Sequence, residues 1–146
     1  DITAIPDLAH AGCRHARQAQ NTSWEQINLV ALGTGHLLAG SFDDAETALI
    51  RAARLALDDG NILQLGVALQ ALAALAAVLG DGQRAARLLG AGTTLAPFWP
   101  LMKHGLGPYL DLAREELGDD FDAGLELGRN LAPADAVTLA LTAPSI

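Results

Sequence analysis

The sequence predicts an all-α fold, a right-handed superhelix of stacked antiparallel helix hairpins with about seven helices. Three observations support this prediction. Apolar residues make up 51% of the chain and are mostly Ala and Leu, which favour helix over strand. Apolar positions recur with the period of an α-helix, and no segment alternates for long with the period of a strand. Turn-forming glycines recur about every 40 residues, so we expect the same helix pair to repeat along the chain.

The first three helices are predicted from their start and stop signals. Pro6 lies in the first turn of a helix over residues 6–18, because proline fits where no backbone donor is needed. Thr22 or Ser23 can cap the next helix, over residues 24–39, and Gly40 suits its left-handed end. Ser41 precedes the third helix, over residues 43–57, which carries its alanines on one face and stops at a polar turn.

The helices in the second half of the chain are predicted from the same kinds of start and stop signals. Helices over residues 62–79 and 83–95 are separated by the turn at Gly80 and Asp81. Residues 96–107 contain two prolines and two glycines and are predicted to be the one long irregular stretch. Gly118 separates helices over residues 108–117 and 120–129, and Pro133 begins a last helix that ends near residue 141.

An internal repeat becomes visible when the turn glycines are aligned. A glycine, an alanine five residues later and a leucine four residues after that recur three times, at Gly40, Ala45 and Leu49, at Gly80, Ala85 and Leu89, and at Gly118, Ala123 and Leu127. The small residue lets the second helix approach the first. We therefore predict a single domain, residues 1–146, with units at residues 1–22 (partial), 23–60, 61–97 and 106–130 and a C-terminal helix at 133–142. The partial first unit leads us to expect a piece of a larger multidomain protein.

Charge and cysteine content limit the classes of function. The net charge of −8 argues against direct nucleic-acid binding, because phosphate recognition needs a basic face. The single cysteine, Cys13, cannot form an internal disulfide and fits a reducing compartment, so we expect a cytoplasmic protein. Residues 62–79 are apolar, but they are short for a membrane span, rich in Ala and flanked by aspartates. We predict instead that they form the most buried helix.

The second unit resembles a tetratricopeptide-type repeat. That family has the order small residue, Gly turn, Ala, bulky apolar residue, Ala and Pro, and the matching residues are Ala73, Gly80, Ala85, Leu89, Gly92 and Pro97. Gly92 replaces the second Ala, and in the preceding unit Leu57 stands where Pro is usual. The period of about 40 residues also exceeds the usual 34. The resemblance implies a non-catalytic protein-interaction domain with its binding surface on the inner face of the first helix of each pair.

A second resemblance covers residues 71–92, ALAALAAVLGDGQRAARLLGAG, and residues 115–141, EELGDDFDAGLELGRNLAPADAVTLAL. These segments are similar to the region before the C-terminal DNA-binding domain of large LuxR-type transcriptional regulators, which are mostly actinobacterial. No phosphate-binding GxxxxGK[ST] loop and no basic helix-turn-helix occur in this chain. The resemblance implies a signal-transmission module whose partners are neighbouring domains of the same polypeptide or a second copy, as in a homodimer.

Some groups of residues have the composition of a chemical site but not its geometry. His10, Cys13 and His15 are metal-ligand types, yet on one helix His15 would lie roughly 160° around the axis from Cys13. The glycines of residues 89–92 are better explained by close helix packing than by a phosphate loop. Three acidic residues after Gly118 fit the first turn of a helix better than a calcium site, namely Asp119, Asp120 and Asp122. We therefore predict no enzyme, no cofactor and no metal.

The candidate interaction surface is the inner face of the first helices together with the apolar stretch after Pro97. Charged residues that clamp a peptide carboxylate are absent from this face, so an apolar occupant or covering is expected. Leu38 occupies a further position on the same face. The candidate residues are Ile27, Val30, Thr34, Leu37, Val67, Gln70, Ala74, Phe98, Trp99 and Met102.

Two functions of different classes remain open for this surface. The first is contact with protein, including self-association. The second is binding of a small-molecule effector between the apolar groove and residues 98–102. Residues 98–102 could also cover neighbouring helices without binding anything, and this is the interpretation that we favour for them.

Overall fold

The structure, a computed structural model, describes residues 2–18, 21–97 and 100–142, which are helical apart from turns and short connections. A short 3-10 helix, η1, precedes eight α-helices in this part of the chain. Their bounds are η1 Ile2–Ala4, α1 Ile5–Gln18, α2 Thr22–Leu38, α3 Phe42–Asp58, α4 Ile62–Val78, α5 Gly82–Leu95, α6 Pro100–Leu117, α7 Asp119–Arg129 and α8 Pro133–Leu141. The prediction of an all-α helical-repeat fold is confirmed.

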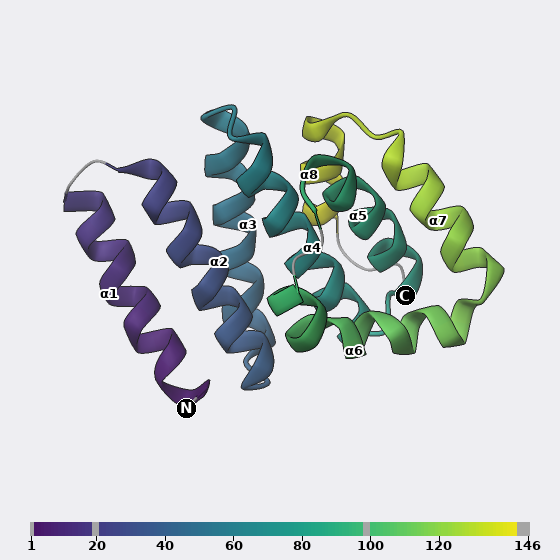
Figure 1. The fold of residues 1–146 in the computed structure, drawn as a ribbon, viewed down its shortest axis with the longest axis horizontal. Coiled ribbons are helices and arrows are strands. Elements are labelled where there is room, and N and C mark those ends of the chain that lie inside the picture. Colours follow the sequence, from purple (N-terminus) through teal and green to yellow (C-terminus); the bar gives the residue numbers. More distant parts are fainter. Residues whose placement is uncertain (1, 19–20, 98–99, 143–146) are drawn as a thin grey trace.

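Helices α1 to α5 lie side by side in chain order, each packed against the next (Figure 1). The turns from α2 to α3, from α3 to α4 and from α4 to α5 each contain a glycine with a positive φ angle. Gly40 and Gly80 have φ angles of 80° and 86°, a backbone conformation that glycine adopts without the steric cost of a Cβ atom. Asn61 and Asp81 then cap α4 and α5, each accepting a hydrogen bond from the backbone N–H three residues later. The glycine turns predicted from the repeat are confirmed.

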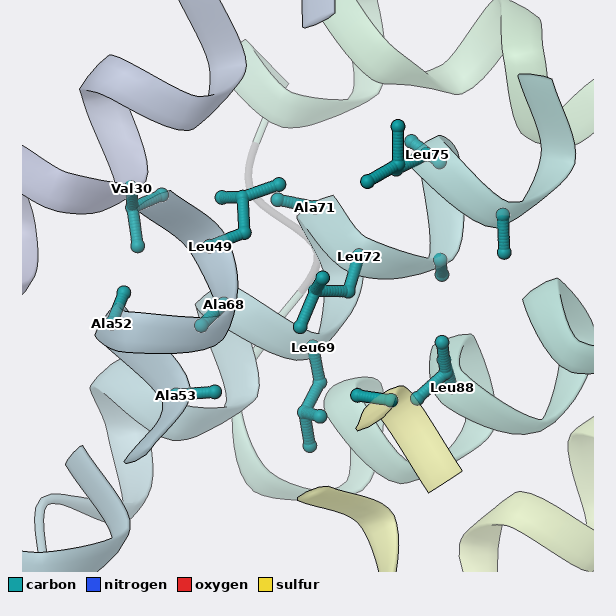
Figure 2. Packing of buried hydrophobic residues seen from close by; sticks show 14 of the residues in the cluster. Val30, Leu49, Ala52, Ala53, Ala68, Leu69, Ala71, Leu72, Leu75 and Leu88 are labelled. Atoms are coloured by element: carbon teal, nitrogen blue, oxygen red, sulfur yellow. The ribbon is translucent and has the colours of Figure 1, made fainter. Parts of the chain in front are cut away.

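Helix α4 is the most buried helix of the described chain, as predicted for residues 62–79. Every residue from Leu65 to Ala76 is buried except Val67. The helix contacts α2, α3, α5, α6 and α8, and Figure 2 shows Leu69 and Leu72 of α4 between α3 and α5. None of the helices in the described ranges combines the length and the apolar character that crossing a lipid bilayer requires.

The sequence did not predict the start of α6. Residues 96–107 were expected to be irregular, but α6 begins at Pro100 and continues through Pro108. Inside a helix a proline removes one backbone donor and its ring crowds the preceding turn, but α6 packs against α4 and α5, and Leu106 and Leu110 on either side of Pro108 are buried. Tertiary packing therefore outweighs the local helix-breaking signal.

The last unit also differs from the two before it. Helices α6 and α7 meet at an angle and share few contacts, and α7 runs along α5 instead (Figure 1). Glycines make this contact close, because a Cβ atom on Gly90 would overlap the carbonyl of Leu125 and one on Gly128 would overlap that of Arg87. The glycines of residues 89–92, expected to permit close packing, lie within α5 and include Gly90 in this interface.

Helix α8 packs against α3, α4 and α5, on the side of α4 away from α6. Arg84 of α5 holds its C-terminal end. The guanidinium Nε donates to the carbonyl of Leu139 over 3.1 Å, and Nη2 donates to the carbonyl of Ala140. A cation at this end also complements the negative end of the helix dipole.

We predict that Arg84→Met lowers the free energy of unfolding by about 1–3 kcal/mol, because two carbonyls at the end of α8 lose a charged donor. Urea unfolding followed by circular dichroism measures this change. Arg87→Met is the matched control, since Arg87 lies on the same helix with an exposed side chain. Equal stabilities of the two variants would contradict the role of Arg84.

Candidate functional site

An apolar groove of about 460 Å³ lies between α2, α4 and α6, with Ile5 of α1 at its edge. None of the described residues that line it is charged. Two of its wall residues, Ile27 and Leu63, keep 40% and 44% of their surface exposed. The residues that line it are Ile5, Ile27, Val30, Ala31, Thr34, Leu38, Leu63, Gln64, Val67, Gln70, Pro97, Gly105 and Leu106. Its volume lies within the range of about 300–1,000 Å³ that is usual for small-molecule sites.

The structure brings five of the candidate surface residues together in this groove, namely Ile27, Val30, Thr34, Val67 and Gln70. Leu37 and Ala74 belong instead to the buried core, with 1% and 0% of their surface exposed, and do not line the groove. Phe98 and Trp99 lie outside the described residues, as does the side chain of Met102.

Several groove residues were not among the candidates. Leu63 lies four residues before Val67, so helical spacing places both on one face of α4 and could have identified it. Leu106 and Gly105 could not have been identified in this way, because they were assigned to an irregular stretch rather than to a helix beside α4.

Gln70 is the polar residue at the inner end of the groove, with 1% of its surface exposed. Its Nε2 donates to the carbonyls of Gly92 and Ala96 over 3.3 and 3.0 Å. Because a carbonyl can only accept, these two contacts determine which end of the amide is nitrogen. The other end, Oε1, is buried and has no hydrogen-bond partner among the described residues.

The position of Gln70 depends on a close crossing of α4 and α5. A Cβ atom on Gly66 would lie 2.9 Å from the carbonyl oxygen of Gly92, so only glycine fits this contact. The crossing brings the last carbonyls of α5 within reach of Gln70 Nε2. The local sequence therefore both allows the approach and provides the side chain that satisfies those carbonyls.

Thr34 is the second residue lining the groove that has a buried polar atom without a hydrogen-bond partner among the described residues. In α3, α5 and α8, Thr47, Thr93 and Thr138 each donate to the carbonyl four residues earlier. The Oγ1 atom of Thr34 is buried and makes no such bond to any described residue. The hydroxyl oxygen of Thr34 and the amide oxygen of Gln70 are thus both buried without a partner among the described residues.

The α2 wall of the groove is anchored by a buried amide. Gln26, with 0% of its surface exposed, donates from Nε2 to Asp59 Oδ2 over 2.6 Å and accepts at Oε1 from Asn61 Nδ2 over 3.1 Å. Asn61 also caps α4. The side chain of Gln26 therefore bonds α2 to the turn from which α4 begins. These bonds fix the position of the α2 wall relative to the α4 wall.

A buried carboxylate joins α1 and α3 to the same wall. Glu25 of α2, with 6% of its surface exposed, accepts at Oε1 from Arg17 Nε over 2.8 Å and from Arg51 Nη2 over 2.9 Å. The two guanidinium groups keep this charge paired, which its burial requires. Charge pairing therefore links the first three helices.

A smaller cavity of about 290 Å³ lies between α1, α2 and α3 and is lined in part by His10, Cys13 and His36. His15 is exposed and does not line it. Within the ranges that the structure describes, no three His, Cys, Asp or Glu side chains are grouped so that they could hold a metal ion. The acidic residues after Gly118 lie in the first turn of α7, as expected.

Comparison of the chain with protein-family models, with curated proteins and with solved structures finds no match.

Burial raises the pKa of Cys13 above its ordinary value of 9.0, an effect that nearby Glu25 reinforces and Arg17 and Arg51 oppose. We predict that iodoacetamide alkylates Cys13 slowly in the folded protein and rapidly in urea, since the thiolate is the reactive form and only 3% of the residue is exposed. Mass spectrometry measures both rates. Equal rates would show that α1 does not protect the thiol.

The same shift has a consequence for stability. Because folding raises the pKa of Cys13, its neutral thiol favours the folded state below pH 9, and this contribution is lost as the pH rises further. Cys13→Ala should reduce the loss of stability above pH 9, measured by urea unfolding across a pH series. An unchanged alkaline loss in this variant would contradict the assignment.

Proposed function

We propose that this protein is a non-catalytic helical-repeat module of a bacterial transcriptional regulator of the LuxR type, and that the groove between α2, α4 and α6 is its recognition surface. The observation that carries the proposal is an apolar groove whose described lining residues are all uncharged. Exposed apolar surface of this kind is typical of binding sites.

The regulator part of the proposal rests on the resemblance of residues 71–92 and 115–141 to the region before the DNA-binding domain of such proteins. The net charge of −8 is compatible with it, since nucleic acid would be bound by another domain. In this proposal the module receives a signal in the groove and passes it to neighbouring domains, or to a second copy, through protein contact.

The packing suggests how an occupant of the groove could act at a distance. The groove walls belong to three helices, and α4 contacts every other helix except α1 and α7 closely. An occupant that favours one spacing of α2 and α6 would therefore shift elements that share α4 as a neighbour. The hydrogen bonds of Gln26 with Asp59 and Asn61 couple such a shift to the turn between α3 and α4.

The test introduces a charge at the rim of the groove in the chromosomal gene. Ile27→Asp places a carboxylate in the groove at a half-exposed position that can tolerate it without loss of the fold. We predict that the transcripts that change in a deletion strain also change in the Ile27→Asp strain, as measured by RNA sequencing.

Leu127→Asp is the matched control, because Leu127 on α7 is 55% exposed and lies outside the groove. This strain should resemble the wild type. The proposal would be overturned by an Ile27→Asp strain whose transcripts match the wild type, or by Ile27→Asp and Leu127→Asp strains that behave alike.

A further inference from the structure

We infer that the protein has a second binding site, the pocket between α5, α6 and α7, and that its ligand is a small organic anion with an apolar body. The pocket has a volume of about 590 Å³ and lies where α6 and α7 diverge beside α5 (Figure 1). This volume is usual for a small-molecule site. The pocket is separate from the groove, because α6 lines the groove with Gly105 and Leu106 and the pocket with Gly107 and Pro108.

The lining of the pocket is positively charged, although the chain as a whole is acidic. The protein has 9 Lys and Arg residues against 17 Asp and Glu residues. Three of these cations, Lys103, Arg114 and Arg129, line the pocket together with one described carboxylate, that of Asp111. Residues 98–102, which lie partly outside the described structure, have no charged side chain in the sequence and therefore cannot cancel the excess.

The cationic side chains are accessible to a ligand. Lys103 is exposed and makes no hydrogen bond or ion pair with another described residue. Arg114 Nη1 lies 3.6 Å from Asp122 Oδ1, and Arg129 Nη1 donates to Glu126 Oε2 over 3.0 Å, while both arginine side chains keep 53% of their surface exposed. Exposed ion pairs of this kind contribute little free energy, and each guanidinium has further N–H donors for an anion.

The guanidinium of Arg114 is also held in place. Its central carbon lies 4.8 Å from the centre of the Phe121 ring, and Phe121 is fully buried. This cation–π contact restricts the arginine side chain before any ligand binds. Binding of an anion therefore orders the side chain less than it would order a freely moving arginine.

The pocket also contains apolar surface. Leu89 of α5, Leu110 of α6 and Leu125 of α7 line it and keep only 7%, 4% and 8% of their surface exposed. Gly107 adds no side chain to the lining, and a Cβ atom there would meet no atom closer than Lys103 Cγ at 3.9 Å. Alkyl or aromatic surface of a ligand gains by leaving water here, while its charged group stays beside the cations. Together these features select an amphipathic anion over an inorganic ion or a neutral molecule.

The test compares two dyes with the same aromatic skeleton, anilinonaphthalene sulfonate and N-phenylnaphthylamine, of which only the first is charged. Fluorescence titration of the purified protein measures both dissociation constants. Raising the NaCl concentration from about 0.01 M to about 1 M shortens the Debye length from about 30 Å to about 3 Å. This change should weaken binding of the anionic dye at least about threefold and should not weaken binding of the neutral dye.

Charge variants assign the preference for an anion to the pocket. Lys103→Gln and Arg129→Gln should each weaken binding of the anionic dye about 2- to 5-fold and leave the neutral dye unaffected. Lys103 has no described partner, so its replacement removes no described contact within the fold. Arg14→Gln is the matched control, because Arg14 is an exposed cation of α1 outside the pocket. This control should bind both dyes like the wild type.

A pair of glycine variants distinguishes the pocket from the groove. Gly107→Leu adds a side chain at the pocket and Gly105→Leu adds one at the groove, and neither Cβ atom would meet an atom closer than 3.9 Å. Gly107→Leu should weaken binding of the anionic dye, whereas Gly105→Leu should leave it unchanged. Leucine favours helix more than glycine does, so both variants should fold, and circular dichroism verifies this.

The inference would be overturned if the wild type did not bind the anionic dye or if salt did not weaken that binding. Equal affinities of the wild type, Lys103→Gln and Arg129→Gln for this dye would also overturn it, as would an equal loss in Arg14→Gln. A loss in Gly105→Leu rather than in Gly107→Leu would assign the anion to the groove and contradict the second site. The transcripts of the Ile27→Asp strain are independent of all these results, so the proposed function and this inference can fail separately.

Discussion

The burial of α4 is the constraint on which the rest of this structure depends. Apart from Gln70, its sequence is apolar on every face from Leu65 to Ala76, so no orientation of the helix could leave one side in water. Two neighbours in a simple row of helices would cover only part of it. The fold covers the remainder with α6 on one side and α8 on the other. Arg84 holds α8 in this position through the last carbonyls of that helix.

The groove is a consequence of how α4 is covered. Helix α6 crosses α4 and leaves α2 and the first half of α4 exposed on one side, where Ile27 and Leu63 remain accessible. Val67 is the single residue between Leu65 and Ala76 that is not buried, and it lines the groove. The groove is therefore the part of the apolar helix α4 that the other described helices leave uncovered.

The polar groups near the groove are of two kinds. Some make bonds that hold the fold, and others have a buried atom without a partner among the described residues. Gln26 bonds to two side chains of the turn between α3 and α4, and Glu25 pairs with arginines of α1 and α3, so both connect α2 to the elements beside it. Gln70 is satisfied only at its nitrogen, and Thr34 makes no bond to a described residue. The second pair stands apart from the first, since native structures leave few buried polar atoms unpaired.

The sequence by itself determined the helices, their glycine turns, the burial of residues 62–79 and five residues of the groove. Caps, turns and apolar periods act over a few neighbouring residues, so they can be read locally. The tertiary structure decided that α6 continues through Pro108, that α7 packs along α5, and that Leu37 and Ala74 are core residues. It also decided that the amide nitrogen of Gln70 donates to the carbonyls of Gly92 and Ala96, while its buried oxygen has no partner among the described residues. These outcomes depend on contacts between residues far apart in the chain, for which the local pattern carries no signal.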